Sequence, residues 1–206
     1  MFAVFLISLI GASWFYFKLQ TTIIIPFCGI WDAHYLFVLL FVVVMLATYS
    51  GGVIDGLDGL SGGVFGIIFG SYGLIALLQN QIDLAAFCFV IVGGLLAFLW
   101  FNIPPARFYM SETGTMSLTI TLVVIAFLTK QVLILPIIAM PLVISSGSSI
   151  IQLLSKKFRH GKKVFIVAPL HHHLQAIGWP ATKVVMRYWV LSIIFASIGI
   201  IISLVG

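Results

Sequence analysis

The feature that most constrains this chain is a series of apolar runs that follow one another with little polar sequence between them. Hydrophobic residues make up 62% of its 206 residues, charged residues make up 7%, and the mean hydropathy is +1.26. Soluble domains are about a quarter charged, so a soluble fold would have almost no polar surface to cover its core. The sequence therefore predicts an integral membrane protein whose solvent is the lipid bilayer, with no nucleic acid as a partner.

The apolar runs approach the length of about 20 residues that a helix needs to cross a bilayer. Glycine, proline and polar residues separate them and predict seven spans, at approximately 2–17, 35–50, 63–78, 84–101, 115–129, 132–154 and 184–205. We therefore expect an all-α polytopic helical bundle that forms a single transmembrane domain over residues 1–206. Between the first two spans, β-branched residues followed by Pro26 and Gly29 predict a short hairpin or re-entrant segment.

Basic residues are concentrated near the C-terminal end, where seven of the ten lysines and arginines lie between Lys156 and Arg187. Such a cluster beside a span is typical of a cytoplasmic loop. Alternation of the seven spans then places residues 51–62 and 102–114 on the same side as residues 155–183. Three polar loops are thus expected to converge on the cytoplasmic face, and ionisable groups at a membrane edge tend to be functional.

The first polar loop, GGVIDGLDGLSGG (residues 51–63), carries Asp55 and Asp58 among glycines. Glycines allow a backbone to approach a ligand closely, and two carboxylates together with substrate phosphates are typical of Mg²⁺ sites. A flexible turn with solvated acids is the alternative. The repeat of Asp-Gly-Leu between two spans favours a functional loop.

The second polar loop, FNIPPARFYMSETGT (residues 101–115), ends one span at Asn102 and opens the next helix near Glu112. An acid in a first helical turn is also favoured by the helix dipole alone. On these grounds, a helix-stabilising role and a ligand role explain Glu112 equally well. Arg107 is more often a topological residue at such a position than a phosphate ligand.

The third polar loop contains APLHHHLQ (residues 168–175), with His171, His172 and His173 just after Pro169. Consecutive side chains on a helix do not face one point, and zinc would want cysteine or carboxylate ligands nearby. Imidazoles at a helix start, close to Lys162 and Lys163, better suit hydrogen bonds to phosphate oxygens.

These three stretches, with KKVFIVAPLHHHLQAIGWPATKVVMRYW (residues 162–189) as the longest, resemble the phospho-N-acetylmuramoyl-pentapeptide transferase family. That family belongs to the polyprenyl-phosphate N-acetylhexosamine-1-phosphate transferases. The match runs from about residue 36 to the end in the same order and spacing. Gly178-Trp179-Pro180 after the histidines points to the muramoyl-pentapeptide branch.

The resemblance implies a ten-span fold of which this chain carries the last seven spans, about the C-terminal two-thirds. It implies a multi-pass enzyme of the bacterial inner (plasma) membrane with its site facing the cytoplasm. The implied reaction transfers phospho-N-acetylmuramoyl-pentapeptide from a UDP-linked donor to undecaprenyl phosphate, requires Mg²⁺ and releases UMP. Family members are often dimeric, which makes a homodimer one expectation.

The family's site residues carry over to this sequence by motif. Asp55, Asp58, His171 and His172 would be catalytic residues in the nucleotide and diphosphate cleft, and Glu112 would take the position of the Mg²⁺-binding acid. The substrate-binding residues would be Asn102, Tyr109, His173 and Lys163.

This chain departs from the family pattern in three ways. Ser111 and Glu112 replace the usual Gly and Asp, and Gly52 stands where Asn is common. The family's adjacent Asp-Asp pair and its nucleotide-binding lysine lie upstream, and no Asp-Asp occurs in this chain. We therefore expect a fragment of a longer reading frame that does not turn over alone.

Other interpretations remain open from the sequence. The chain could be a short member completed by another polypeptide, or a non-catalytic protein that binds polyprenyl phosphate. Within the enzyme class the alternative is the N-acetylglucosamine-1-phosphate branch. A small transporter is a further alternative, although transporters place ionisable groups near the midplane, whereas the acids here lie at the ends of spans.

Overall fold

The computed structural model describes residues 2–18, 21–50, 54–159 and 161–205. Apart from one hairpin, its elements are helical. The helices are α1 (Phe2–Lys18), α2 (Leu36–Ser50), α3 (Leu60–Leu78), α4 (Ile82–Asn102), α5 (Ser111–Leu128), the 3₁₀ turn η2 (Val132–Ile134), α6 (Leu135–Ile138), α7 (Met140–Phe158), α8 (Leu170–Ala176) and α9 (Ala181–Val205), and the strands are β1 (Thr22–Ile25) and β2 (Gly29–Asp32).

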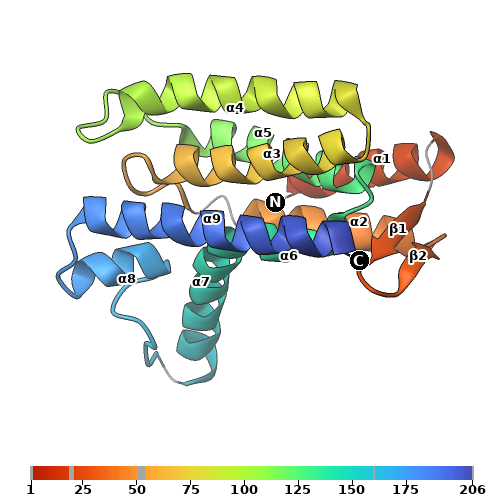
Figure 1. Ribbon diagram of the computed structural model, residues 1–206. Helices are drawn as coiled ribbons and strands as arrows, with labels where there is room; N and C mark the ends of the chain where they lie inside the picture. The colour runs from red at the N-terminus through yellow and green to blue at the C-terminus, as the bar shows by residue number, and fades with distance from the viewer. Residues whose placement is uncertain (1, 19–20, 51–53, 160, 206) are drawn as a thin grey trace.

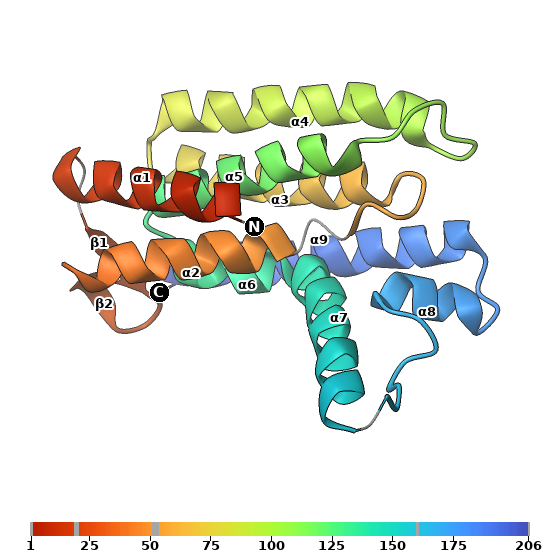
Figure 2. The ribbon, with the colours of Figure 1, turned by 180° about the vertical axis from the view of Figure 1, so that it is seen from behind.

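The long helices α1 to α5 and α9 run alongside one another, and α3 packs between α4 and α9 (Figures 1 and 2). The hairpin lies at one end of this bundle. The polar loops before α3, after α4 and before α9 lie at the other end. The described parts of the first two polar loops and the part of the third next to α9 therefore lie at one end of the bundle, while the third loop begins at the far end of α7, which projects from the bundle.

Apolar side chains form the core and also most of the outer surface. Phe15, Phe37, Phe41 and Phe127 bring α1, α2 and α5 together, with the rings of Phe41 and Phe127 centred 4.7 Å apart. Along α4 and α9, in contrast, many large apolar side chains are exposed, as Trp100 and Val205 are. An apolar exterior of this kind is suited to lipid, which confirms the expectation of a polytopic membrane protein.

Among the described residues, four helices (α3, α4, α5 and α9) are long and apolar enough to span a membrane, and α6 with α7 adds a fifth if that bent pair is one span. The apolar helices α1 and α2 are shorter. The seven apolar runs of the sequence each became helical, but their number as membrane spans stays a prediction.

The hairpin expected from Pro26 and Gly29 is present. Its strands pair antiparallel from Thr22 opposite Asp32 to Ile25 opposite Gly29. Gly29 has a φ of +95°, a backbone conformation that favours glycine at the turn. The hairpin is tied to the bundle because the Ile24 amide donates to the Lys130 carbonyl at 3.0 Å.

The continuous span expected over 132–154 is wrong in one respect, because the helix breaks there. The segments Val132–Ile138 and Met140–Phe158 are inclined by 79°. Pro136 and Pro141 lie at the starts of α6 and α7, and a proline both lacks an amide hydrogen and clashes with the preceding turn. The helix therefore restarts in a new direction, and α7 projects from the bundle (Figures 1 and 2).

Candidate functional site

The loop that carries Asp55 and Asp58 is held at its end by Gly59. Gly59 adopts a φ of +79°, and its amide donates to Asn102 Oδ1 at 2.9 Å. Asn102 Nδ2 in turn donates to the Phe108 carbonyl at 2.8 Å. The indole Nε1 of Trp189 donates to the Gly59 carbonyl at 3.1 Å. One residue of the first loop is thus bound to the end of α4 and to α9.

The two aspartates lie in turns before α3 and use one carboxylate oxygen each to hold the loops. Asp55 Oδ1 accepts from the Ser61 hydroxyl at 2.7 Å, and Asp58 Oδ2 accepts from the Ala106 amide at 3.1 Å. Both side chains are partly buried. Asp58 therefore joins the first polar loop to the second across 48 positions of sequence.

The histidine segment is fixed to α7 by polar side chains. Ser148 Oγ accepts from the Leu170 amide at 2.9 Å, at the first residue of α8. Gln152 accepts from the amides of Val164 and Phe165 at 3.0 Å each and donates to the Phe165 carbonyl at 2.8 Å. These bonds satisfy backbone groups that have no helical partner, and they set where α8 begins.

The histidines meet the acidic loop at Gly56. A Cβ atom at this glycine would lie 2.7 Å from His172 Nε2 and 3.0 Å from His171 Nε2. The two imidazole rings are centred 4.4 Å apart. The close approach is possible because residue 56 has no side chain. The first and third polar loops are therefore in direct contact.

The three histidines differ in their surroundings, as expected for consecutive helical residues. His171 is fully buried, whereas His172 is partly buried and its Nδ1 lies 2.9 Å from Gln175 Oε1. His173 Nδ1 accepts from the Ile166 amide at 3.3 Å and so faces the preceding loop. His171 and His172 therefore approach the acidic loop, whereas His173 is bound to the loop before α8.

Burial also sets the protonation of His171. Loss of hydration, with a smaller contribution from the neighbouring His172, lowers the pKa of His171 to about 4. The ring is neutral near pH 7, with one nitrogen that donates and one that accepts. A neutral imidazole at this buried place can donate one hydrogen bond and accept one.

The remaining predicted residues are not engaged in this contact. Glu112 is exposed in the first turn of α5, and Tyr109 and Lys163 are exposed in loops. Within the described part of the chain, none of these three side chains makes a hydrogen bond or ion pair. The structure thus brings Asp55, Asp58, Asn102, His171 and His172 together and leaves Glu112, Tyr109 and Lys163 free to meet a ligand.

The residues present suit a magnesium ion that also uses substrate oxygens. Residues 2–18, 21–50, 54–159 and 161–205 contain no cluster of three His, Cys, Asp or Glu side chains able to hold a metal. Mg²⁺, however, is usually held by one or two carboxylates plus substrate phosphates. Asp55 and Asp58 each retain one oxygen without a described hydrogen-bond partner, so this donor set fits such an ion.

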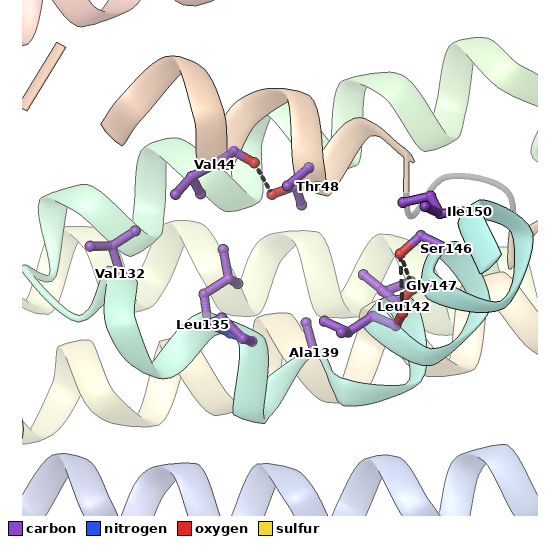
Figure 3. Close-up of a pocket in the computed structure, with 12 residues that line it drawn as sticks. Val44, Thr48, Val132, Leu135, Ala139, Leu142, Ser146, Gly147 and Ile150 are labelled. Atoms are coloured by element: carbon purple, nitrogen blue, oxygen red, sulfur yellow. Dashed lines mark hydrogen bonds between the residues drawn. The ribbon is translucent and has the colours of Figure 1, made fainter. Parts of the chain in front are cut away.

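An apolar pocket of about 290 Å³ lies where α2 faces η2, α6 and the start of α7 (Figure 3). Its two hydroxyl groups are turned to their own helices, since Thr48 donates to the Val44 carbonyl and Ser146 to the Leu142 carbonyl. The lining left to a ligand is therefore nearly all hydrocarbon.

Sequence reasoning missed several residues that build the site. Trp189 lies within the long apolar run of α9, and no sequence pattern marked it as part of the site. It packs so closely on Gly63 that a Cβ there would lie only 2.0 Å from its Nε1. Gln152 is a polar residue inside an apolar helix, and that contrast was a usable signal. No sequence pattern predicted the apolar pocket, because the pocket depends on the bend at Pro141.

Comparison with known proteins gives a family match. The model of the family described as glycosyl transferase family 4 matches residues 1–130. A phospho-N-acetylmuramoyl-pentapeptide-transferase of Anoxybacillus flavithermus is 41% identical over 202 residues, which are 96% of this chain and 62% of the relative. The protein of the same name from Geobacillus sp. (strain WCH70) is 44% identical over 149 residues, which are 72% of this chain and 46% of the relative.

A third relative with that name, from Listeria monocytogenes serotype 4b, is 39% identical over 181 residues, covering 87% of this chain and 56% of the relative. The chain thus spans between 46% and 62% of the length of these three curated relatives.

Proposed function

This chain belongs to glycosyl transferase family 4, and we propose that it acts in transferring phospho-N-acetylmuramoyl-pentapeptide from a UDP-linked donor to undecaprenyl phosphate. The shared name of its relatives supports the donor. The observation that carries the proposal is the contact at Gly56, where His171 and His172 meet the loop of Asp55 and Asp58. Imidazole donors beside carboxylates that can hold a cation suit a diphosphate, whose oxygens need hydrogen-bond donors and whose negative charge needs a counter-charge.

In the proposed reaction, an oxygen of the lipid phosphate attacks the β-phosphorus of the nucleotide sugar. A new P–O bond forms, the bond from the β-phosphorus to the bridging oxygen breaks, and UMP leaves with that oxygen. Such transfers depend mainly on positioning and on stabilisation of charge on phosphoryl oxygens. No oxidant or further reactant is required.

The chain's own residues supply the positioning. Asp58 accepts a hydrogen bond from Ala106, and Asn102 is hydrogen-bonded to both Gly59 and Phe108. These bonds hold the first two loops in a fixed position relative to each other. His172, which is partly exposed, donates to a phosphate oxygen, and His171 supports it from the buried side. Tyr109, Lys163 and His173 border the donor on this proposal.

Magnesium is proposed as the cofactor. When bound, it would neutralise charge on the diphosphate and stabilise the leaving UMP. Asp55 and Asp58 would hold it through their remaining oxygens, with Glu112 as a third carboxylate.

The apolar pocket at the bend between α6 and α7 supports a lipid acceptor, because its hydrocarbon lining suits an isoprenoid chain. We place the polar loops on the cytoplasmic side of the bacterial plasma membrane, since the basic residues Lys156, Lys157 and Lys163 lie in the segment that leads from α7 to the histidines. A homodimer remains part of the proposal.

The test uses the chain purified in lipid nanodiscs. Binding of UDP-N-acetylmuramoyl-pentapeptide and of undecaprenyl phosphate is measured separately, and UMP release is measured when both are present with Mg²⁺. We expect both ligands to bind, and the donor to bind more tightly than UDP-N-acetylglucosamine. Tighter binding of UDP-N-acetylglucosamine would instead favour that branch of transferases, and binding of the lipid alone would favour a non-catalytic protein.

Two substitutions at Asp58 separate its charge from its structural role. Asp58→Asn keeps an oxygen for the Ala106 amide but removes the charge, so we expect it to bind donor poorly while unfolding at the same temperature. Asp58→Ala should lose both properties. Asp83→Asn, at the opposite end of the bundle, is the matched control and should bind as the wild type does. Equal donor binding in wild type and Asp58→Asn would contradict the proposed site.

A further inference from the structure

Several buried polar atoms around His171 have no hydrogen-bond partner. Six buried side-chain atoms in the described residues lack one, and four of these belong to three side chains on adjoining helices. The four are His171 Nδ1 and Nε2 on α8, the Tyr188 hydroxyl on α9 and the Ser145 hydroxyl on α7. All three residues are at most 4% exposed.

These three side chains are neighbours in space. The rings of His171 and Tyr188 are centred 6.2 Å apart, at 82° to each other. The Ser145 and Tyr188 hydroxyls are close enough to interact with each other, although they do not meet ordinary hydrogen-bond geometry. One helical turn further on, Ser148 receives the Leu170 amide next to His171. The unpaired atoms therefore gather where α7, α8 and α9 meet, directly behind the contact at Gly56.

Leaving such atoms unpaired is costly. A buried donor or acceptor without a partner gives up its hydrogen bonds to water and gains none in return, and four such atoms lie in one place. A buried water typically makes two to four hydrogen bonds to polar groups of this kind. One water among the three side chains would pair most of these atoms at once.

We propose that Tyr188 and Ser145 are positioning residues that, with one buried water, form a hydrogen-bonded network holding the His171 imidazole in a single tautomer. In this network Nδ1 accepts and Nε2 carries the proton. Because Nε2 is the atom that faces Gly56, the N–H then points at the loop of Asp55 and Asp58. The burial that keeps His171 neutral is consistent with this arrangement.

The role of this network in transfer rests on the proposed function, but the network itself does not. Tyr188 and Ser145 act through His171 and do not touch substrate. Removing a hydroxyl from either should alter the imidazole without altering the acidic loop.

The test is ¹⁵N NMR of the whole chain in nanodiscs, with histidine labelled in the ring and His171 assigned by its loss in His171→Asn. Protonated and unprotonated ring nitrogens have well-separated shifts, so their averages report the tautomer directly. In the wild type we expect His171 to be a single Nε2–H tautomer. In Tyr188→Phe and in Ser145→Ala we expect the two nitrogen shifts to move toward each other as the tautomers mix.

A double variant shows whether the two hydroxyls act through one network. Tyr188→Phe with Ser145→Ala should give nearly the same His171 shifts as either change alone, because members of one network are not additive. Ser192→Ala is the control: its buried hydroxyl donates to the Tyr188 carbonyl at 2.7 Å, and its loss should leave the His171 shifts unchanged. If Tyr188→Phe misfolds, Ser145→Ala still decides the matter.

Unchanged His171 shifts in Tyr188→Phe or Ser145→Ala would overturn the network. An Nδ1–H tautomer in the wild type would overturn the proposed direction of the proton. Neither readout requires donor, acceptor or turnover, so a failed transfer assay and a failed network are distinguished.

Discussion

Gly56 is the residue on which the predicted site depends most directly. A methyl group there would fall 2.7 Å from His172 Nε2 and 3.0 Å from His171 Nε2, so both imidazoles would have to move. We expect Gly56→Ala to fold with a loss of about 1–3 kcal/mol, the usual range for overpacking. Donor binding should weaken in the same variant, as measured by titration in nanodiscs.

Gly66→Ala is the matched control for that change. Gly66 lies within α3, and nothing lies within 4 Å of the position its Cβ would take. It should retain the donor binding of the wild type and be at least as stable, because alanine favours a helix interior more than glycine does. Wild-type donor binding in Gly56→Ala would show that the histidines do not contact the ligand.

The pH dependence of stability is a second prediction at the residue scale. Because burial lowers the pKa of His171 from 6.5 to about 4, the unfolded chain binds a proton more readily than the folded chain between these values. Stability is therefore complete above about pH 6.5 and falls as the pH drops toward 4, by roughly 3 kcal/mol from this group. The midpoint of thermal unfolding against pH measures it.

In His171→Asn this part of the pH dependence should be absent. The slope of the unfolding midpoint against pH is compared between the wild type and His171→Asn, so the contribution of the carboxylates, which is common to both, cancels. Parallel slopes between pH 4 and 6.5 would contradict the burial of His171.

At the scale of elements, α7 reverses the arrangement of a helix on a soluble protein. Its polar residues Ser145, Ser148, Gln152 and Ser155 are buried, while Ile150, Leu153 and Phe158 on the other side are exposed. The buried side holds the loop that leads to α8 through Gln152 and Ser155. The exposed side is suited to lipid, so α7 connects a lipid-facing surface to the histidines.

The pocket beside α7 yields a prediction about the acceptor. Gly147 lines it and has open space where a Cβ would lie, so Gly147→Leu should fill the pocket without straining the helix. We expect undecaprenyl phosphate to bind about tenfold more weakly, which corresponds to about 1.4 kcal/mol, with donor binding unchanged. Gly94→Leu, on α4 and equally open, is the control. Equal lipid binding by both variants would place the acceptor elsewhere.

Sequence periodicity and punctuation predicted the elements better than the way they meet. The structure contains the predicted order of helices, the hairpin after α1 and the helix that opens at the histidines. These were predictable because the length of an apolar run and a nearby proline or glycine determine where a helix or turn begins and ends. The bend at Pro141 was missed since the run from 132 to 154 is apolar on both sides of it. Tyr188, Ser145 and Trp189 were missed because their partners are distant in sequence, and no local pattern marks them.

At the scale of the whole molecule, the polar loops at one end and the hairpin at the other make sidedness testable with the native cysteines. Cys28 is exposed in the hairpin and Cys88 is buried. We expect a membrane-impermeant maleimide to label intact protoplasts that express the chain, and Cys28→Ser to abolish the signal. In that background Lys163→Cys, at an exposed position beside the histidine segment, should react only after the membrane is permeabilised.

The two positions must behave oppositely, because a bundle with these two ends cannot present both to one compartment when its helices cross the bilayer. Labelling of Lys163→Cys in intact protoplasts, with Cys28 protected, would invert the orientation and place the histidines outside, which would contradict the proposed use of a cytoplasmic UDP-linked donor. Labelling of both would mean that the helices do not span. Protection of Lys163→Cys with labelling of Cys28 would place the acidic loop and the histidines together on the cytoplasmic side, where the proposed donor would have to bind.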